Sequence, residues 1–344
     1  MAGTSEPPVA PLARPRPTWG FRGMAQTQTT YVAVAFAVLI LVIWILAPVF
    51  VTPRNLLNVS KNFSFIALMA LGETLVIISG GIDLSVGSVC ALSAIVTMML
   101  MRFFSTAAAA QVPGATIALA ALLALALAAL IGLVNGLLIA RIRLSPFVTT
   151  LGMLSVARGM TYVLTQGRAQ YPVGPDVALF TRLANGAVLG LPTQLVYLLV
   201  LAVLMALALR HLVWGRHLYA VGGNAHAAAL TGVRVPHVVV SVYVLSSLAA
   251  GFSGVLLAGW LGAAPANLAT GYELRVIAAA VIGGANLAGG VGGAAGAVIG
   301  AALIEVIRNG FVLIGANTYW EEVFVGVIII IAVLVDQLRT RRVF

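Results

Sequence analysis

Four ionisable side chains lie within or between long apolar runs of the sequence, and they are the first candidates for chemistry. Glu73, Arg158 and Glu305 fall inside such runs, and Asp83 stands between two of them. An ionisable residue within a membrane segment is costly, so it is by default a candidate for a substrate or ion pathway. The alternative is structural pairing, for example of Arg158 with a carboxylate on another helix.

Asp83 belongs to the segment GGIDLSVGS at residues 80–88. The two glycines are suited to end one helix, and Asp83 or Ser85 is suited to cap the next one. A carboxylate at a helix break inside a membrane must face protein or water. Two interpretations therefore stay open: Asp83 is only a helix cap, or it belongs to a broken-helix element beside a transport path.

A related segment, GGANL at residues 283–287, is followed by two further glycine pairs. When the double glycines are aligned, Asp83 matches Asn286. Corresponding glycine-interrupted apolar segments in two halves of a chain are typical of transporters built from repeats. The match covers few positions, however, and a chain this rich in glycine can produce it by chance.

The most polar interior stretch is the loop at residues 213–235. Asn224 is suited to be an N-cap, the residues from Ala225 to Thr231 favour helix, and Gly232 is suited to end it. The pattern predicts a helix of about two turns outside the membrane spans. A helix this short is marginal in water, so it needs a partner surface. The alternative is a connecting loop that is merely capped.

Enzymatic and metal chemistry find little support in the sequence. Four histidines lie in or beside the 213–235 loop, but no pair has the spacing of one helical turn and no cysteine accompanies them, which disfavours a metal site. The single cysteine, Cys90, is expected to serve packing. The segment Gly251-Phe252-Ser253-Gly254 resembles an intramembrane protease pattern, but no histidine base follows His237. We expect no catalytic and no metal-binding residues.

The ionisable and polar candidates must be positioned by membrane helices, because the composition excludes most other classes of protein. Of 344 residues, 61% are hydrophobic and 8% charged, against about 25% charged in soluble proteins. This excludes a soluble enzyme, a disordered protein and a secreted disulfide scaffold. The net charge of +10 lies in short gaps between apolar runs, so it indicates the positive-inside rule rather than a nucleic-acid partner.

The apolar runs predict an all-α fold, a polytopic transmembrane helix bundle of about ten spans. The run at 273–285 is short, and the glycine-rich stretch after it is a candidate broken or re-entrant element, so eight or nine full spans fit nearly as well. The expected runs are 31–51, 62–80, 86–101, 115–140, 147–165, 194–212, 236–262, 273–285, 294–314 and 322–336.

The chain divides into a tail and one membrane domain. Residues 1–28 are rich in proline and arginine and contain no long apolar run, whereas residues 29–344 form a single transmembrane permease domain with the 213–235 loop. Ten spans place both termini on one side. Most basic residues share that side, so both termini are expected in the cytoplasm.

Several stretches together resemble the membrane permease subunits of ATP-binding-cassette importers for ribose, xylose and related monosaccharides. They are ISGGIDLSVGS (78–88), VGGNAHAAALTGV (221–233) and ATGYELRVIAAAVIGGANLAGGVGG (269–293), supported by LSPFVTTLGMLSVARGMTYVL (144–164) and AVLVDQLR (332–339). The likeness follows the same order along nearly everything after residue 30, which makes it more specific than any one motif.

The resemblance implies a homodimer of such subunits in a bacterial cytoplasmic (inner) membrane. A periplasmic or extracellular binding protein delivers the sugar, and cytoplasmic ATPase subunits drive the cycle. A short cytoplasmic helix couples permease and ATPase, and the matching positions are Gly222, Gly223, Asn224, Ala228, Leu230 and Gly232. The polar candidates for the translocation path are Asn62, Glu73, Asp83, Asn135, Thr149, Ser155, Arg158 and Asn286.

The chain itself lacks the means to use ATP by a P-loop. That motif needs Gly-Lys-Ser/Thr, and the one lysine, Lys61, lies in Ser60-Lys61-Asn62. We therefore expect no cofactor on this chain and ATP use by the partner. The rival hypothesis is a secondary transporter driven by an ion gradient. It would give Glu73, Asp83 and Glu305 a role as ion sites but leaves the capped helix unexplained.

Overall fold

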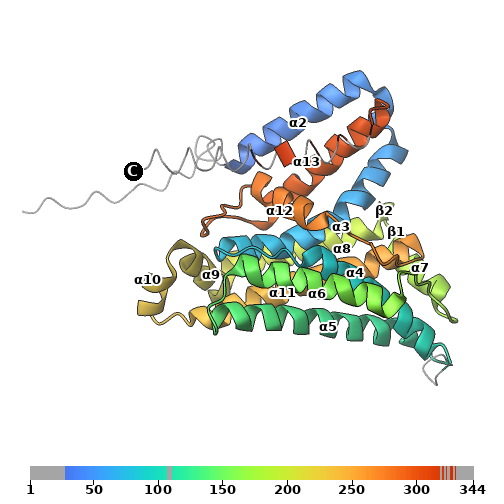
Figure 1. The fold of residues 1–344 in the computed structure, drawn as a ribbon. Helices are drawn as coiled ribbons and strands as arrows, with labels where there is room; N and C mark the ends of the chain where they lie inside the picture. The colour runs from blue at the N-terminus through green and yellow to red at the C-terminus, as the bar shows by residue number, and fades with distance from the viewer. Residues whose placement is uncertain are drawn as a thin grey trace, which may run out of the picture.

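A computed structural model describes residues 28–106 and 111–317 and a few single positions between 320 and 330. Almost all ordered elements in these ranges are helices (Figure 1), so the expectation of an all-α bundle is confirmed. The elements are α2 (Gln28–Leu46), η1 (Pro48–Val51), α3 (Pro53–Ile78), α4 (Val86–Phe104), α5 (Ala115–Ala140), α6 (Pro146–Thr165), α7 (Val177–Asn185), β1 (Ala187–Val188), β2 (Leu191–Pro192), α8 (Thr193–His211), α9 (Val213–Gly223), α10 (Ala225–Leu230), α11 (Val235–Leu261), α12 (Tyr272–Ile282) and α13 (Ala294–Leu313).

Seven helices in the described part of the chain are long and apolar enough to cross a membrane. They are α3, α4, α5, α6, α8, α11 and α13. The apolar part of α2, Ala33–Leu46, is shorter, and α12 has 11 residues, in line with the short run expected there. The run at 322–336, the motif at 332–339 and all but the last residue of the 1–28 tail lie outside the described residues.

The centre of the bundle is α3, whose spanning window is the most buried of the seven. It contacts α8, α11, α12 and α13, while α11 also contacts α4 and α5. Small residues permit this close packing, which matters where lipid offers no hydrophobic drive for helix association. A Cβ atom added to Gly72 would lie 2.8 Å from the Ser246 Cα, and one added to Gly136 would lie 2.8 Å from the Val240 Cα.

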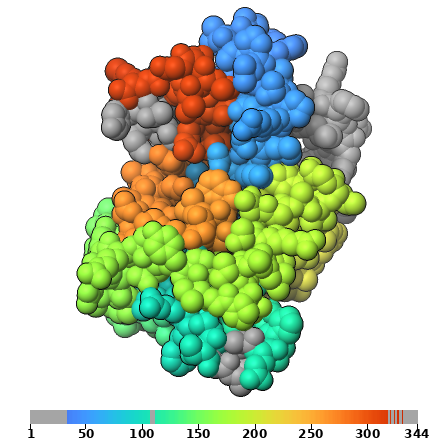
Figure 2. Space-filling model, turned by 90° about the vertical axis from the view of Figure 1, so that its right-hand side faces the viewer, coloured from blue at the N-terminus to red at the C-terminus, as the bar shows by residue number. Residues whose placement is uncertain are grey.

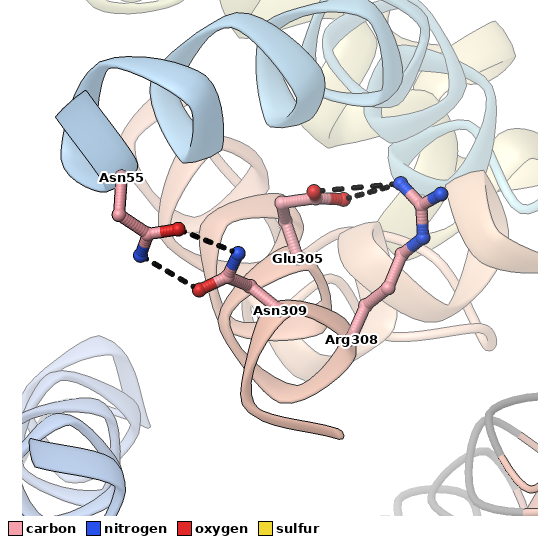
Figure 3. Close-up of polar contacts among 4 residues, drawn as sticks. All are labelled: Asn55, Glu305, Arg308 and Asn309. Carbon is pink, nitrogen blue, oxygen red and sulfur yellow. Dashed lines mark hydrogen bonds and ion pairs between the residues drawn. The ribbon is translucent and has the colours of Figure 1, made fainter. Parts of the chain in front are cut away.

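The first helix extends the bundle along α13 (Figure 1). Where α3 begins, Asn55 and Asn309 exchange two side-chain hydrogen bonds of 2.9 and 3.0 Å (Figure 3). Elsewhere on α13, the Arg308 guanidinium lies 3.4 Å from the Glu305 carboxylate (Figure 3). Glu305, which the ion-gradient hypothesis uses as an ion site, therefore has an arginine partner in its own helix.

The loops gather at two opposite ends of the bundle. One end, on the left in Figure 1, carries α9 and α10. The other carries α7 and the hairpin of β1 and β2, whose yellow-green surface faces the viewer in Figure 2. There Gln170 and Ala264 pair through two backbone hydrogen bonds of 2.8 and 3.0 Å. The sequence patterns predicted neither α7 and the hairpin nor α9.

At this second end Asp176 joins the start of α5 to α7. Its carboxylate accepts hydrogen bonds from the Thr116 hydroxyl and, at 2.9 Å, from the Gly114 N–H. These bonds favour the ionised form, and they hold the pKa of Asp176 below its usual range. The carboxylate thus fixes Gly114 and Thr116, at the start of α5, at neutral pH.

Candidate functional site

The break between α3 and α4 is a short turn in which Gly81, Asp83 and Ser85 are buried and Gly80 is exposed. The Gly80 N–H donates to the Ile77 carbonyl at 2.9 Å and the Gly81 N–H to the Val76 carbonyl at 3.0 Å, which ends α3. Gly80 has φ +84°, a backbone conformation that favours glycine. The turn joins two helices that are each long enough to cross a membrane, so a place for Asp83 beside a transport path stays a prediction.

Two acids meet at this break. The Glu73 Oε1 accepts the Asp83 N–H at 3.0 Å. The Asp83 Oδ1 accepts the N–H of Ser85 at 2.9 Å and its hydroxyl at 2.6 Å, and Oδ2 accepts the Ser246 hydroxyl at 3.3 Å. Asn135 completes the group by donating to the Ser85 hydroxyl at 3.2 Å. All five side chains are fully buried. We call them the acidic cluster.

The acidic cluster ties together four helices, α3, α4, α5 and α11. Asp83 is not the N-cap of α4, since Ser85 occupies that position; the carboxylate instead fixes the turn before the helix. Glu73, Asp83 and Asn135 were predicted from the sequence as polar candidates for the path. The sequence did not predict that Ser85 accepts a hydrogen bond from Asn135 or that Ser246 donates one to Asp83. No feature of the sequence pointed to Ser246, because only the tertiary fold brings α11 close to this turn.

The second glycine-rich segment forms a similar break between α12 and α13. The Gly284 N–H donates to the Val281 carbonyl at 2.9 Å, and Gly284 has φ +99°. The Asn286 Oδ1 accepts the N–H two residues ahead, of Ala288, at 2.7 Å, as Asp83 does with Ser85. The two segments aligned in the sequence therefore share the same side-chain turn, which strengthens the repeat interpretation.

The polar loop forms the expected short helix. The Asn224 Oδ1 accepts the Ala227 N–H at 2.9 Å, so Asn224 is the N-cap of α10, and Gly232 follows the helix with φ +88°. Ala228 is buried against the bundle. Leu230 is 77% exposed, and Gly223 and Asn224 are exposed as well. The predicted helix and its cap are confirmed; the helix ends at Leu230, one residue early.

The other path candidates lie apart from the acidic cluster. Asn62 and Asn286 are half-buried, Thr149 is buried, and Ser155 is exposed on α6. Arg158 pairs with no carboxylate of the described residues: its Nη1 donates to the Leu268 carbonyl at 2.7 Å and to the Ala266 carbonyl at 3.3 Å. This arginine holds the loop between α11 and α12, and no described contact joins it to a path.

A cavity of about 790 Å³ lies between α3, α5, α8 and α11. Its lining is apolar and includes Leu71, Met205 and Leu248. A binding site for a polar solute needs a few convergent polar groups, which this cavity lacks. It does not suit a sugar.

Comparisons with known proteins agree with this architecture. Residues 55–333 match the family described as the permease component of branched-chain amino acid transport systems. The chain is 39% identical to a probable ABC transporter permease protein of Sinorhizobium fredii over 93% of each chain. It is 39% identical to the ribose import permease protein RbsC of Escherichia coli, over 88% of this chain and 92% of that one. It is also 36% identical to the galactose/methyl galactoside import permease protein MglC of E. coli, over 90% and 94%. No solved structure shows significant similarity.

Proposed function

Since the chain belongs to the family of transport-system permease components and is the membrane-spanning permease subunit of an ATP-binding-cassette importer, we propose that it carries a monosaccharide or related polyol into the cytoplasm. The family is one of transport permeases, not of enzymes. An importer of this kind works with a separate ATPase and a substrate-binding protein. We assign a sugar as the substrate because the chain is similar, over most of both chains, to permeases named for ribose and galactose.

The arginines of the chain support one orientation of the subunit in the membrane. The end with α9 and α10 carries exposed arginines and, among the described residues, no exposed acid; these arginines are Arg141, Arg143, Arg210, Arg216 and Arg234. The opposite end carries the exposed arginines Arg54, Arg102, Arg168 and Arg182. The bias therefore depends on the arginines that the sequence places near its two ends, which are Arg14, Arg16, Arg22, Arg339, Arg341 and Arg342. The positive-inside rule supports a cytoplasmic location for α10 and both termini. The membrane is the bacterial inner membrane.

In this orientation α10 is the element that meets the ATPase. Buried Ala228 holds the helix against its own subunit, while Leu230 points an apolar side chain away from it. A six-residue helix with an exposed leucine is suited to enter an apolar groove of a partner. ATP is bound and hydrolysed by that partner, and none is bound by this chain.

The path for the sugar lies between two copies of the chain. On α6 the side chain of Ser155 is exposed, and nothing lies within 4 Å of a Cβ placed on Gly152 or Gly159. This open face with a hydroxyl supports α6 as the lining and as the contact with a second subunit. Asn62 and Asn286 supply further accessible polar groups. Glu73, Asp83 and Asn135 would reach the path only if the helices around the acidic cluster separated.

The experiment that tests this function measures how much ATPase stays bound to the purified permease. Leu230→Glu places a charge on the proposed docking side of α10, so we expect most of the ATPase to be lost. Leu189→Glu is the control, because Leu189 is 98% exposed at the hairpin of the opposite end; it should leave the ATPase bound. Equal retention by both variants would refute the docking role of α10.

A further inference from the structure

Three backbone segments meet at Gly222, near the end of α9. A Cβ atom on this residue would lie only 1.7 Å from the Ile78 carbonyl oxygen and 2.5 Å from the Gly290 nitrogen. Real Cβ atoms do not approach backbone this closely, so only glycine fits. Gly222, three residues before the start of α10, thus touches the end of α3 and the glycine-rich break after α12 at the same point.

The junction is hydrogen-bonded as well as tightly packed. The Gly290 N–H donates to the Ile78 carbonyl at 2.8 Å, which joins the two breaks directly. One turn earlier in α9, the Tyr219 hydroxyl donates to the Gly292 carbonyl at 2.8 Å. Gly289, with φ +93°, lies on the far side of the contact, since its Cβ would be 2.6 Å from the Gly222 oxygen.

A contact of this kind passes a movement of α9 on to the ends of α3 and α12 almost undiminished. Backbone packed on backbone has no side-chain rotamers that could absorb a shift, and close-packed interiors transmit strain. On one side of the junction, α9 is firmly joined to α10, because Leu218 and Val221 share an apolar cluster with Ala228. On the other side, the chain after Ile78 leads straight to Asp83 in the acidic cluster.

We propose that Gly222 is a positioning residue through which α9 and α10 move both helix breaks together. When the ATPase displaces α10, the end of α3 and the segment between α12 and α13 shift as one body. The inference rests on the proposed function, in which α10 meets the ATPase, and adds where the movement goes inside the permease. Because the two breaks are hydrogen-bonded to each other, one displacement of α10 moves the helices of both halves of the bundle.

The chain contains a matched control in the next residue. Gly223 is exposed, and nothing lies within 4 Å of a Cβ placed on it. Neither Gly222 nor Gly223 is among the glycines with positive φ. Alanine at either position therefore makes the same chemical change on the same helix, and only the contact with the two breaks differs.

The test uses the complete complex, reconstituted in vesicles with its ATPase and binding protein. It measures bound ATPase, ATP hydrolysis and sugar transported per ATP hydrolysed. Gly222→Ala should retain the ATPase but transport about tenfold less sugar per ATP, within the range by which such mutations alter coupling. Gly223→Ala should match the wild type. Wild-type transport per ATP in Gly222→Ala would overturn the proposal.

A second variant decides the question if Gly222→Ala does not accumulate in the membrane. Tyr219→Phe removes only the hydroxyl that bonds to Gly292, so it leaves the packing unchanged. We expect about threefold less transport per ATP, as for one lost hydrogen bond, with the ATPase still bound; an unchanged ratio would overturn the proposal. Failure of the proposed function is distinguishable, because it shows as unchanged ATPase binding in Leu230→Glu.

Discussion

At the scale of single residues, Asp83 shows how a carboxylate is kept inside a membrane bundle. It accepts hydrogen bonds from Ser85 and Ser246 and is shielded from bulk solvent, since its exposed fraction is zero. A buried polar group without partners is costly, so the donors around Asp83 make its burial tolerable. They also give it a structural task, the fixing of the turn between α3 and α4.

This task predicts different outcomes for two substitutions. Asp83→Asn keeps an acceptor for Ser85, and the Ser246 hydroxyl is free to turn and accept, so it should cost about 1 kcal/mol, the net contribution of one hydrogen bond, and spare transport. Asp83→Leu leaves the Ser85 and Ser246 donors unsatisfied, which should cost about 1–3 kcal/mol. Thermal unfolding of the purified permease checks the stability, and uptake in cells checks the function.

The acid itself would have a role in transport if the measurements disagreed with this pattern. An Asp83→Asn variant that inserts stably but takes up no sugar would contradict a purely structural role. It would support the interpretation that Asp83 lies near the path.

Residue-scale predictions succeeded where partners are close in sequence. The Asn224 cap was predictable because an N-cap bonds to the residue three positions ahead, a local rule. The partners of Arg158 were not predictable, because the carbonyls of Ala266 and Leu268 reach it only through the packing of α6 beside the loop after α11. The same holds for Ser246 and Asp83.

At the scale of elements, the position of each helix follows from apolar runs and glycines, whereas its neighbours do not. The expected runs from 31–51 to 294–314 each correspond to an observed helix, because a membrane imposes both length and composition. The residues between 166 and 193 have no such constraint, so α7 and the hairpin were missed. Helix α9 was missed because the polar loop was considered only for its capped part.

The packing of α5 on α11 provides a test at this scale. Ala128 is fully buried, and a Cβ placed on Gly251 of α11 would lie 2.7 Å from the Ala128 Cβ. Ala128→Leu should therefore overpack the contact and lower the free energy of unfolding by about 1–3 kcal/mol. Thermal unfolding of the purified subunit in detergent is the measurement.

The control for this substitution lies two residues earlier on the same helix. Ala126 is exposed on the outer face of α5, so Ala126→Leu adds the same atoms without a neighbour to displace. It should unfold at the wild-type temperature. If the two variants lost equal stability, the described α5–α11 contact would be wrong.

At the scale of the whole molecule, the chain is a bundle of apolar helices with one small helix, α10, at one end. Composition alone predicted the membrane bundle, and the motifs predicted the importer class, because both are properties of the sequence as a whole. The junction at Gly222 was not predictable. It depends on three segments far apart in the sequence, and glycines have too many roles in such a chain to signal one contact.

The central claim is that this subunit moves sugar only with force from a separate ATPase. The most direct measurement is uptake of labelled ribose or galactose by vesicles that contain the purified permease, with the ATPase and binding protein added or left out. We expect uptake only with both partners and ATP present, unchanged when the proton and sodium gradients are collapsed. Accumulation by the permease alone, driven by an ion gradient, would contradict the claim.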